Sequence, residues 1–203
     1  LASEFDKHVL VVDTNLSAPN LGIHFGFIDM EHTIHDVLSN KTKTNKAIYE
    51  YDTGLHIMPG ILKGKYPKQW DLNKIIDEVR KKYDIILLDT SPNLDELSSL
   101  IEVVDEFIAI TTPDYPSLST TLQLADILKK SAVIRGVIIN SFKGKRFELK
   151  KQEIEETTSI PVLGVLPYDL KIQKSIAELA PLYYYRNRRK FVRRLREVAR
   201  QLV

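Results

Sequence analysis

Polar side chains and turn residues close several apolar runs of this 203-residue chain, and these residues could carry chemistry. They are Asp13, Asn15, Asp89, Thr111, Asn140, Pro167 and Asp169. Mg²⁺ prefers carboxylate and other oxygen ligands. Asp89 and Asp13 are therefore the candidates for contact with a metal ion.

Each candidate also has an ordinary structural interpretation. Asp13 and Asp89 could each cap a following turn, and Asn140 is of a type that favours turns at the end of a strand. Pro167 and Asp169 could belong to a plain loop. The residues alone leave these alternatives open.

The positions of these residues depend on a series of strand-like runs rich in Val, Ile and Leu. The runs cover residues 8–13, 84–89, 106–111, 134–140 and 161–167, with a weaker run at 54–59. Continuous apolar runs of this kind are typical of strands buried on both faces of a parallel sheet. Helical patterns lie between them, at 71–79, 116–128, 148–157 and 171–180. This alternation predicts an α/β fold with a doubly wound, mostly parallel sheet and helices on both faces.

In such a fold, ligands bind beyond the carboxyl ends of the strands. The polar residues named above follow those ends, so we expect them to converge at one edge of the sheet. This convergence is the main hypothesis for the position of the site.

Composition excludes several classes of protein. The chain has no cysteine, which rules out disulfides, thiolate metal sites, iron–sulfur ligation and cysteine nucleophiles. No apolar run reaches the roughly 18 residues that a membrane-spanning helix needs. The five histidines are scattered without the spacing of a metal site, so we interpret them as structural. The length and the 43% apolar content predict one globular domain over residues 1–203.

The C-terminal part of the chain is strongly basic. Residues 181–203 carry a net charge of +7, whereas the other residues sum to −5. Residues 186–203 predict an amphipathic helix with an apolar stripe and an Arg-rich face. Three interpretations stay open: a terminal helix docked on the sheet, a helix that binds a membrane surface, or a helix that contacts DNA.

Five segments in order resemble the MinD/ParA-type ATPases, a P-loop family with a deviant Walker A motif. Residues 9–22 (VLVVDTNLSAPNLG) resemble the segment after that family's nucleotide-binding loop, and residues 83–92 (YDIILLDTSP) resemble its Walker B strand and second switch. Residues 111–118 (TTPDYPSL), 136–140 (GVIIN) and 160–169 (IPVLGVLPYD) are similar to its next strand end and its adenine-side segments. Short segments at 47–50, 54–59 and 147–149 are most similar to the MinD branch, especially its archaeal members.

The resemblance implies a role for each candidate residue. Asp89 and Asp13 would contact Mg²⁺, and Asn15 would orient the attacking water. The adenine side would be formed by the amide of Asn140 and the main chain of Pro167 and Asp169. The implied cofactors are ATP and Mg²⁺, with ATP bridging two protomers in a homodimer. Such proteins are expected in the cytoplasm, in part peripherally at the inner face of the cell membrane, with a regulator protein as a partner.

The family's Gly-rich phosphate-binding loop, with its two lysines, is the first departure. The chain has two Gly-Lys pairs, Gly64-Lys65 and Gly144-Lys145, and neither fits the spacing or the position of that loop. We therefore expect that roughly 30 residues of strand, loop and helix are missing from the N-terminus. The loss of a central strand would leave two neighbouring strand edges unpaired.

The second departure lies in the two switch segments. Asn15 stands where the family has an Asp that orients the attacking water, and an amide cannot act as a base but can position water. Asn93 stands where a Gly often follows the Ser-Pro of the second switch. We therefore expect slow hydrolysis rather than none.

Three functions stand as hypotheses. The first is an ATP-dependent switch of the MinD type, which takes part in spatial organisation such as division-site placement. The second is a ParA-like ATPase that partitions DNA, which the Arg-rich tail supports. The third is a scaffold without the phosphate-binding loop, which binds partner proteins and hydrolyses nothing. ATP-driven dimerisation separates the first hypothesis from the third.

Overall fold

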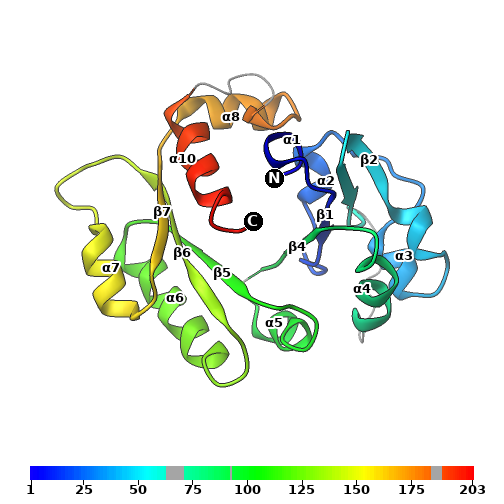
Figure 1. The fold of residues 1–203 in the computed structure, drawn as a ribbon, viewed down its shortest axis with the longest axis horizontal. Helices are drawn as coiled ribbons and strands as arrows, with labels where there is room; N and C mark the ends of the chain where they lie inside the picture. Colours follow the sequence, from blue (N-terminus) through cyan, green and yellow to red (C-terminus); the bar gives the residue numbers. More distant parts are fainter. Residues whose placement is uncertain (63–70, 92, 184–188) are drawn as a thin grey trace. The chain divides into compact units, whose positions relative to one another are not determined.

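Strands and helices alternate along the chain, as the apolar runs predict (Figure 1). The computed structural model describes residues 1–62, 71–91, 93–183 and 189–203. The chain divides into two compact units, Leu1–Val103 and Val104–Val203, and each is described by itself. Parallel strand pairs dominate both units, so the predicted α/β class is confirmed.

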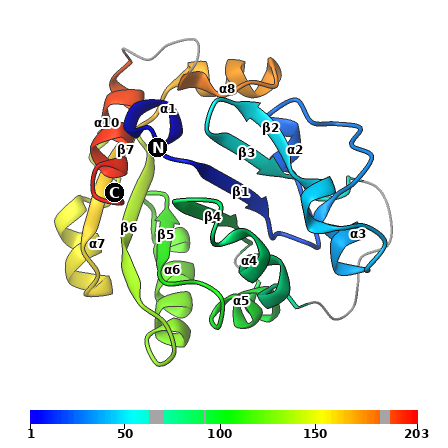
Figure 2. The same ribbon diagram turned by 45° about the vertical axis from the view of Figure 1, so that its right-hand side comes forward.

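The sheet of the first unit has the strand order β2-β3-β1-β4 in the described part of the chain. Its strands are β1 (Val9–Asp13), β2 (Tyr49–Asp52), β3 (Leu55–Met58) and β4 (Ile85–Asp89). β1 lies inside the sheet and pairs in parallel with both β3 and β4 (Figure 2). Val9, Leu10 and Val12 are all buried, which is the pattern of a strand covered on both faces.

Short helices connect these strands. In chain order they are α1 (Ala2–Phe5), α2 (Leu21–His24), α3 (Ile34–Leu38), the 3₁₀ helix η1 (Thr44–Ala47), α4 (Asn73–Val79) and α5 (Leu94–Leu100). The helix predicted after Asp71 is α4, and the Asp71 carboxylate accepts the Asn73 N–H at 2.8 Å. Ile75, Ile76 and Val79 are buried, as their helical spacing predicts.

The strand β2 is not predicted by the sequence pattern. It runs antiparallel to β3 at an edge of the sheet, and its residues alternate between aromatic and acidic side chains instead of forming an apolar run. The Tyr49 hydroxyl donates to the His32 carbonyl at 2.9 Å and accepts the His32 N–H at 3.0 Å. The Tyr51 ring meets the Phe25 ring edge-on, with 5.0 Å between centroids. Tertiary contacts of two tyrosines hold this strand. A pattern of apolar residues along the sequence does not reveal such contacts.

The second unit contains a parallel sheet with the order β5-β6-β7, again among the described residues. Its strands are β5 (Phe107–Thr111), β6 (Ile134–Phe142) and β7 (Val162–Pro167). Its helices are α6 (Tyr115–Leu128), α7 (Lys151–Thr158), α8 (Leu170–Ala177) and α10 (Lys190–Ala199). The basic helix predicted over 186–203 is α10, and residues 186–188 lie outside the described residues. Within the described ranges, no helix is both long enough and apolar enough to cross a membrane.

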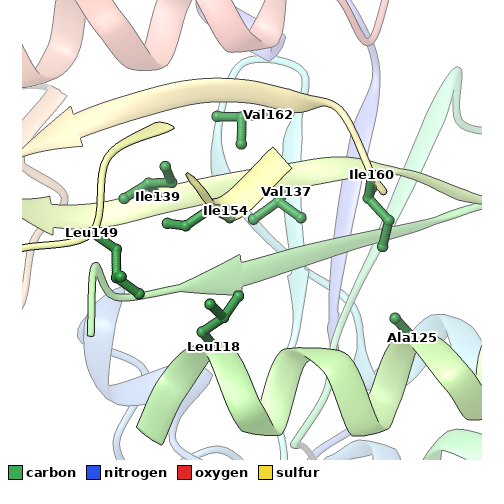
Figure 3. Close-up of a cluster of buried hydrophobic side chains, with 8 residues drawn as sticks. All are labelled: Leu118, Ala125, Val137, Ile139, Leu149, Ile154, Ile160 and Val162. Carbon is green, nitrogen blue, oxygen red and sulfur yellow. The ribbon is translucent and has the colours of Figure 1, made fainter. Parts of the chain in front are cut away.

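Helices pack on both faces of this second sheet. Val137 and Ile139 of β6 face α6 and α7, within a cluster of buried side chains (Figure 3). The cluster comprises Leu118, Ala125, Val137, Ile139, Leu149, Ile154, Ile160 and Val162. Ile138 packs instead with Leu166 of β7 and Val198 of α10. Because alternate residues of a strand point to opposite faces, β6 contributes to two hydrophobic layers.

The apolar side of α10 is docked on β7, as one of the three interpretations of the basic tail expects. Gly164 of β7 permits this contact, because a Cβ at that position would overlap with Val198 Cγ2. Arg193, Arg194 and Arg200 are exposed on the other side of the helix. The basic face therefore remains on the surface of this unit.

Two edge strands carry exposed apolar side chains. β4 is an edge strand of the first sheet, and β5 is an edge strand of the second, among the residues that the structure describes. Leu87 of β4 is 37% exposed and Ile110 of β5 is 67% exposed. Unpaired strands of this kind can accept another strand through their free N–H and C=O groups.

Replacing Gly164 with alanine tests the close packing of α10 on β7. The added methyl group would overlap with Val198, so we expect Gly164→Ala to lower the free energy of unfolding by about 1–3 kcal/mol. Urea denaturation measures the change. Val198→Ala removes the opposing methyl groups, so in that background the same substitution should cost clearly less. Equal costs in the two backgrounds would contradict the packing argument.

Candidate functional site

Asp13 and Asp89 end the neighbouring parallel strands β1 and β4 and are partners in the strand register. Strands in a sheet lie about 4.8 Å apart, and in-register residues of parallel neighbours point to the same face. The two carboxylates therefore lie side by side at the carboxyl edge. The Asp89 carbonyl accepts both the N–H and the hydroxyl of Thr14 at 2.8 Å. These two bonds tie the loop after β1 to the end of β4.

The Asp13 carboxylate is buried, and only one of its two oxygens has a hydrogen-bond partner among the described residues. Its Oδ2 accepts the Leu21 N–H at 3.0 Å, which is a capping contact at the start of α2. Its Oδ1 is buried without a hydrogen-bond partner among the described residues. Burial raises the pKa of Asp13 to about 6, and the charge of Asp89 acts in the same direction, against the N–H groups of Leu21 and Gly60. One oxygen thus has a structural role, and the other has no partner among the described residues.

Asp89 is more exposed than Asp13, and its pKa is raised as well. The cause is the loss of water around its carboxylate, which the charge of nearby His24 opposes. A cation beside such a pair would relieve both the desolvation and the repulsion between the carboxylates. The pair is therefore a favourable place for a cation.

Asn15 lies two residues beyond Asp13 in the same loop. Its side-chain Oδ1 is buried without a hydrogen-bond partner in the described part of the chain. Its backbone N–H acts on the Asp13 carboxylate and lowers the pKa of that group. An amide oxygen can accept a hydrogen bond from water but does not take its proton. The Asn15 side chain is therefore suited to orienting a water molecule.

Gly60 follows β3 and allows the chain to pass close to Asp13. A Cβ at this position would overlap with Pro19 Cβ and would lie 3.3 Å from Asp13 Oδ2. Gly60 is not among the site residues predicted from the sequence. Its one signal there is its place directly after the strand-like run 54–59.

His35 of α3 joins the two segments that surround Asp13. Its Nδ1 accepts the Ile61 N–H at 3.1 Å, and its Nε2 lies 3.0 Å from the Leu16 carbonyl. Because the Ile61 N–H can only donate, Nδ1 must accept, and the ring hydrogen on Nε2 is donated to Leu16. Burial lowers the pKa of His35, which keeps the ring neutral. These contacts agree with the interpretation of this histidine as structural, and they hold the loop that carries Asn15 and Leu16.

The predicted adenine-side residues lie at strand ends of the second unit. β6 extends to Phe142, two residues beyond its predicted end, because its pairing with β7 continues there. The Asn140 Oδ1 accepts the Ser141 N–H at 2.9 Å, which is a local turn-type contact. Pro167 is the register partner of Phe142, whose carbonyl accepts the Tyr168 N–H at 2.8 Å. Asn140 and Pro167 therefore share one edge of this sheet.

Asp169 uses its carboxylate within the second unit. Oδ1 accepts the Lys171 N–H at 2.9 Å at the start of α8, and the carboxylate also forms an ion pair with Arg189. The hydrogen bond from Arg189 is the main cause that holds the Asp169 pKa below its usual value. The side chain thus fixes the ends of two helices, and the main chain of Asp169 is the part that remains as a candidate for a base contact.

Thr111 and Asn93 make local contacts. Thr111 is buried at the end of β5, and its hydroxyl donates to the Thr112 carbonyl at 3.3 Å. The Asn93 N–H donates to the Ser91 hydroxyl at 3.2 Å. Pro92, between Ser91 and Asn93, lies outside the described residues. These contacts add no ligand to the Asp13–Asp89 pair.

The donor set of the first unit fits Mg²⁺. In the described ranges, no three His, Asp or Glu side chains are grouped so that they could hold a metal. At phosphate sites Mg²⁺ keeps several waters and takes one or two carboxylates together with phosphate oxygens. The partnerless Oδ1 of Asp13 and the neighbouring Asp89 match that requirement.

Residues 1–182 match the family model described as CobQ/CobB/MinD/ParA nucleotide binding domain. The chain belongs to this family. The family membership agrees with carboxylates at the ends of parallel strands, where α/β proteins bind their ligands. It also confirms the resemblance that the five sequence segments indicate.

The chain is similar to a MinD protein, to an ATP-binding protein and to a ParA family ATPase. It is 27% identical to the septum site-determining protein MinD of Pyrococcus horikoshii, solved with Mg-ADP, with a TM-score of 0.86 over 97% of this chain and 83% of that one. It is 25% identical to an uncharacterised ATP-binding protein of Methanocaldococcus jannaschii, over 91% of this chain and 72% of that protein. A ParA family ATPase of Chlorobium tepidum shares the fold, at 21% identity and a TM-score of 0.77 over 100% of this chain and 87% of that one.

Asp13→Asn tests the burial of the carboxylate through the pH dependence of stability. A raised pKa means that the folded state binds the proton more tightly, so stability falls as the pH rises from the unfolded pKa through the folded one. Relative to the wild type, Asp13→Asn should therefore gain about 2–3 kcal/mol between pH ~4 and pH ~7. Urea unfolding at both pH values measures the difference. Asp77→Asn, on the exposed side of α4, is the matched control and should show no such gain.

His35→Gln tests the two hydrogen bonds by which this ring joins Leu16 to Ile61. Because the folded pKa of His35 is lowered, its stabilising effect is complete above pH ~6.5 and is lost as the pH falls below that value. We expect His35→Gln to cost about 1–3 kcal/mol at pH ~8, and we expect the gap to the wild type to narrow at pH ~5.

Chemical denaturation at the two pH values measures this gap. The control is His8→Gln, the same change at an exposed histidine. A gap for His35→Gln that stays constant with pH would contradict the neutral, buried imidazole.

Proposed function

We propose that the protein is an ATP-binding switch of the MinD type, with Mg²⁺ and the nucleotide phosphates at the Asp13–Asp89 pair. The buried, partnerless Oδ1 of Asp13 is the observation that carries the proposal, because such an atom needs a cation or a proton. Family membership and the Mg-ADP of the Pyrococcus relative support the same ligands.

Mg²⁺ would neutralise phosphate charge at this site. Asp13 Oδ1 and Asp89 would hold the ion, directly or through its waters, while the Leu21 N–H keeps the other Asp13 oxygen in place. His35 would hold the loop of Asn15 against the segment that follows β3. Contacts of the Leu21 N–H and of His35 would thus fix the positions of Asp13 and Asn15 without a ligand.

The side chain of Asn15 determines the expected rate of hydrolysis. Its partnerless Oδ1 would accept a hydrogen bond from the attacking water and fix its direction. Without a carboxylate at this position, no group there takes the proton of that water. Hydrolysis should therefore be slow, and the ATP-bound state long-lived.

The Asn140 amide and the main chain of Pro167 and Asp169 are the proposed contacts of the nucleotide base, in keeping with the resemblance. The engagement of the Asp169 carboxylate with Arg189 supports a main-chain role for this residue.

The phosphates also need the backbone N–H groups and lysines of a phosphate-binding loop. Of the two Gly-Lys pairs, Gly64-Lys65 lies outside the described residues. The other, Gly144-Lys145, forms a turn in which the Lys145 N–H donates to Glu148 at 2.7 Å. We propose that a strand and loop outside these 203 residues supply the cradle, and the open edges of β4 and β5 support this.

The finer parts of the proposal concern assembly and location. ATP would bridge two copies into a homodimer in the cytoplasm, where a regulator protein would act on it and the switch would serve spatial organisation such as division-site placement. The exposed arginines of α10 would contact an anionic surface, either a membrane or, in the ParA manner, DNA. Sedimentation with anionic liposomes and a salt-sensitive shift of duplex DNA separate these two targets.

The switch is tested by ATP-dependent dimerisation of the native protein isolated from its source cells, followed by light scattering. We expect a dimer with ATP and Mg²⁺, none with ADP, and none for Asp89→Asn. Asn15→Asp restores a carboxylate beside the attacking water, so ATP turnover should rise by about tenfold or more.

The alternative function is a partner-binding scaffold without turnover, which Asn15 and the unmatched phosphate loop favour. It predicts a single oligomeric state with and without ATP. Mass spectrometry of the native protein tests the loop directly, because a heavier protein with a Gly-rich, Lys-containing peptide upstream of Leu1 would exclude the scaffold. A native protein that neither contains such a peptide nor dimerises with ATP would overturn the switch.

A further inference from the structure

A cavity of about 1020 Å³ opens in the first unit between α4 and the segment that follows α3. Figure 1 labels α4 and α3, the helix that this segment follows. None of its lining residues belongs to the Asp13–Asp89 site, so the nucleotide switch does not account for it. Small-molecule sites have volumes of about 300–1,000 Å³, and the cavity has room for such a ligand.

Four lysines line this cavity. Lys41 and Lys43 come from the segment after α3, and Lys74 and Lys82 come from α4 and the residues that follow it. None of the four ammonium groups forms an ion pair with a residue that the structure describes. Their charge is therefore available to a ligand.

The acidic residues of the lining do not neutralise these lysines. They are Asp71 and Glu78, which leaves the lining with a net charge of +2. The Asp71 carboxylate accepts the N–H and the side-chain amide of Asn73, at 2.8 and 2.9 Å, and so faces the start of α4. An excess of one charge on a concave surface is focused by the low-dielectric walls. The cavity should therefore attract anions.

The gathering of lysines contrasts with the composition of the unit. Residues 1–103 contain 11 Lys and Arg against 16 Asp and Glu, and four of the basic residues meet at this one cavity. The backbone that carries two of them is set by the end of α3. Asn40 has a φ of 55°, and the Lys41 N–H donates to the Asp36 carbonyl at 2.8 Å, as at a helix end closed by a left-handed residue.

The rest of the lining is polar on one part and apolar on another. Thr42 and Asn45 offer hydroxyl and amide hydrogen bonds, while Ile48, Ile75 and Val79 are apolar. Ammonium and hydroxyl donors suit phosphate oxygens, and an apolar wall suits an organic group. The four exposed lysines all line one cavity, which favours a small anion over a nucleic-acid duplex.

We propose that this cavity binds a small phosphorylated organic molecule, with its phosphate among Lys41, Lys43, Lys74 and Lys82. The organic part would lie on the apolar wall. This site goes beyond the nucleotide switch and would give the first unit a second ligand.

Calorimetric titration of the whole chain with glucose 6-phosphate and with inorganic pyrophosphate tests the proposal. EDTA in the buffer removes divalent cations from the Asp13–Asp89 site, and salt near 20 mM keeps charge screening low. We expect both probes to bind. Lys43→Gln and Lys74→Gln should each weaken binding by about three- to tenfold, and the double variant should weaken it further.

Lys46→Gln and Lys81→Gln are the matched controls. Both lysines are exposed and lie next in the sequence or nearby, yet neither lines the cavity. We expect binding to these variants to stay within about twofold of the wild type, since only long-range charge is lost. Equal weakening by the controls, or no binding of either probe at millimolar concentration, would overturn the proposal. Thermal unfolding of each free variant shows whether its fold is intact.

Discussion

The burial of the Asp13 carboxylate is the constraint on which the carboxyl edge of the first unit depends. A charge removed from water is costly unless hydrogen bonds or an opposite charge compensate it. The Leu21 N–H compensates one oxygen, and the close approach of Gly60 brings a second backbone donor nearby. The other oxygen has no partner among the described residues. The fold thus keeps one buried carboxylate oxygen without a described partner, at a cost in stability.

The neighbouring residues hold this edge in place without adding a fixed charge. Thr14 ties the loop to the end of β4 through two hydrogen bonds to a carbonyl, and His35 joins Leu16 to Ile61 as a neutral ring. A lysine or arginine in place of His35 could donate to the Leu16 carbonyl but could not accept the Ile61 N–H, and it would add a charge. A buried neutral imidazole avoids this, because its two nitrogens serve one donor and one acceptor.

Sequence patterns predict the elements that depend on local composition and miss those that depend on tertiary contact. Val- and Ile-rich runs predict β1, β3, β4, β5, β6 and β7, because buried parallel strands need apolar residues on both faces. The pattern misses β2, since contacts of Tyr49 and Tyr51 with distant residues hold that strand. Asp13 and Asp89 are predictable from their positions at strand ends. His35 and Gly60 are not, because their importance lies in partners that the chain brings together only on folding.

The amide at position 15 has an electrostatic consequence for the Asp13–Asp89 pair. A carboxylate there would place a third negative charge beside Asp13 and Asp89, whose pKa values are both already raised. Like charges at such distances disfavour ionisation of one another. Asn15 keeps an oxygen that can hold water while it avoids this repulsion. In the proposed switch, an amide at position 15 would also leave the attacking water without a proton acceptor there. A lower repulsion between the carboxylates and a slower hydrolysis would then be two effects of the same residue.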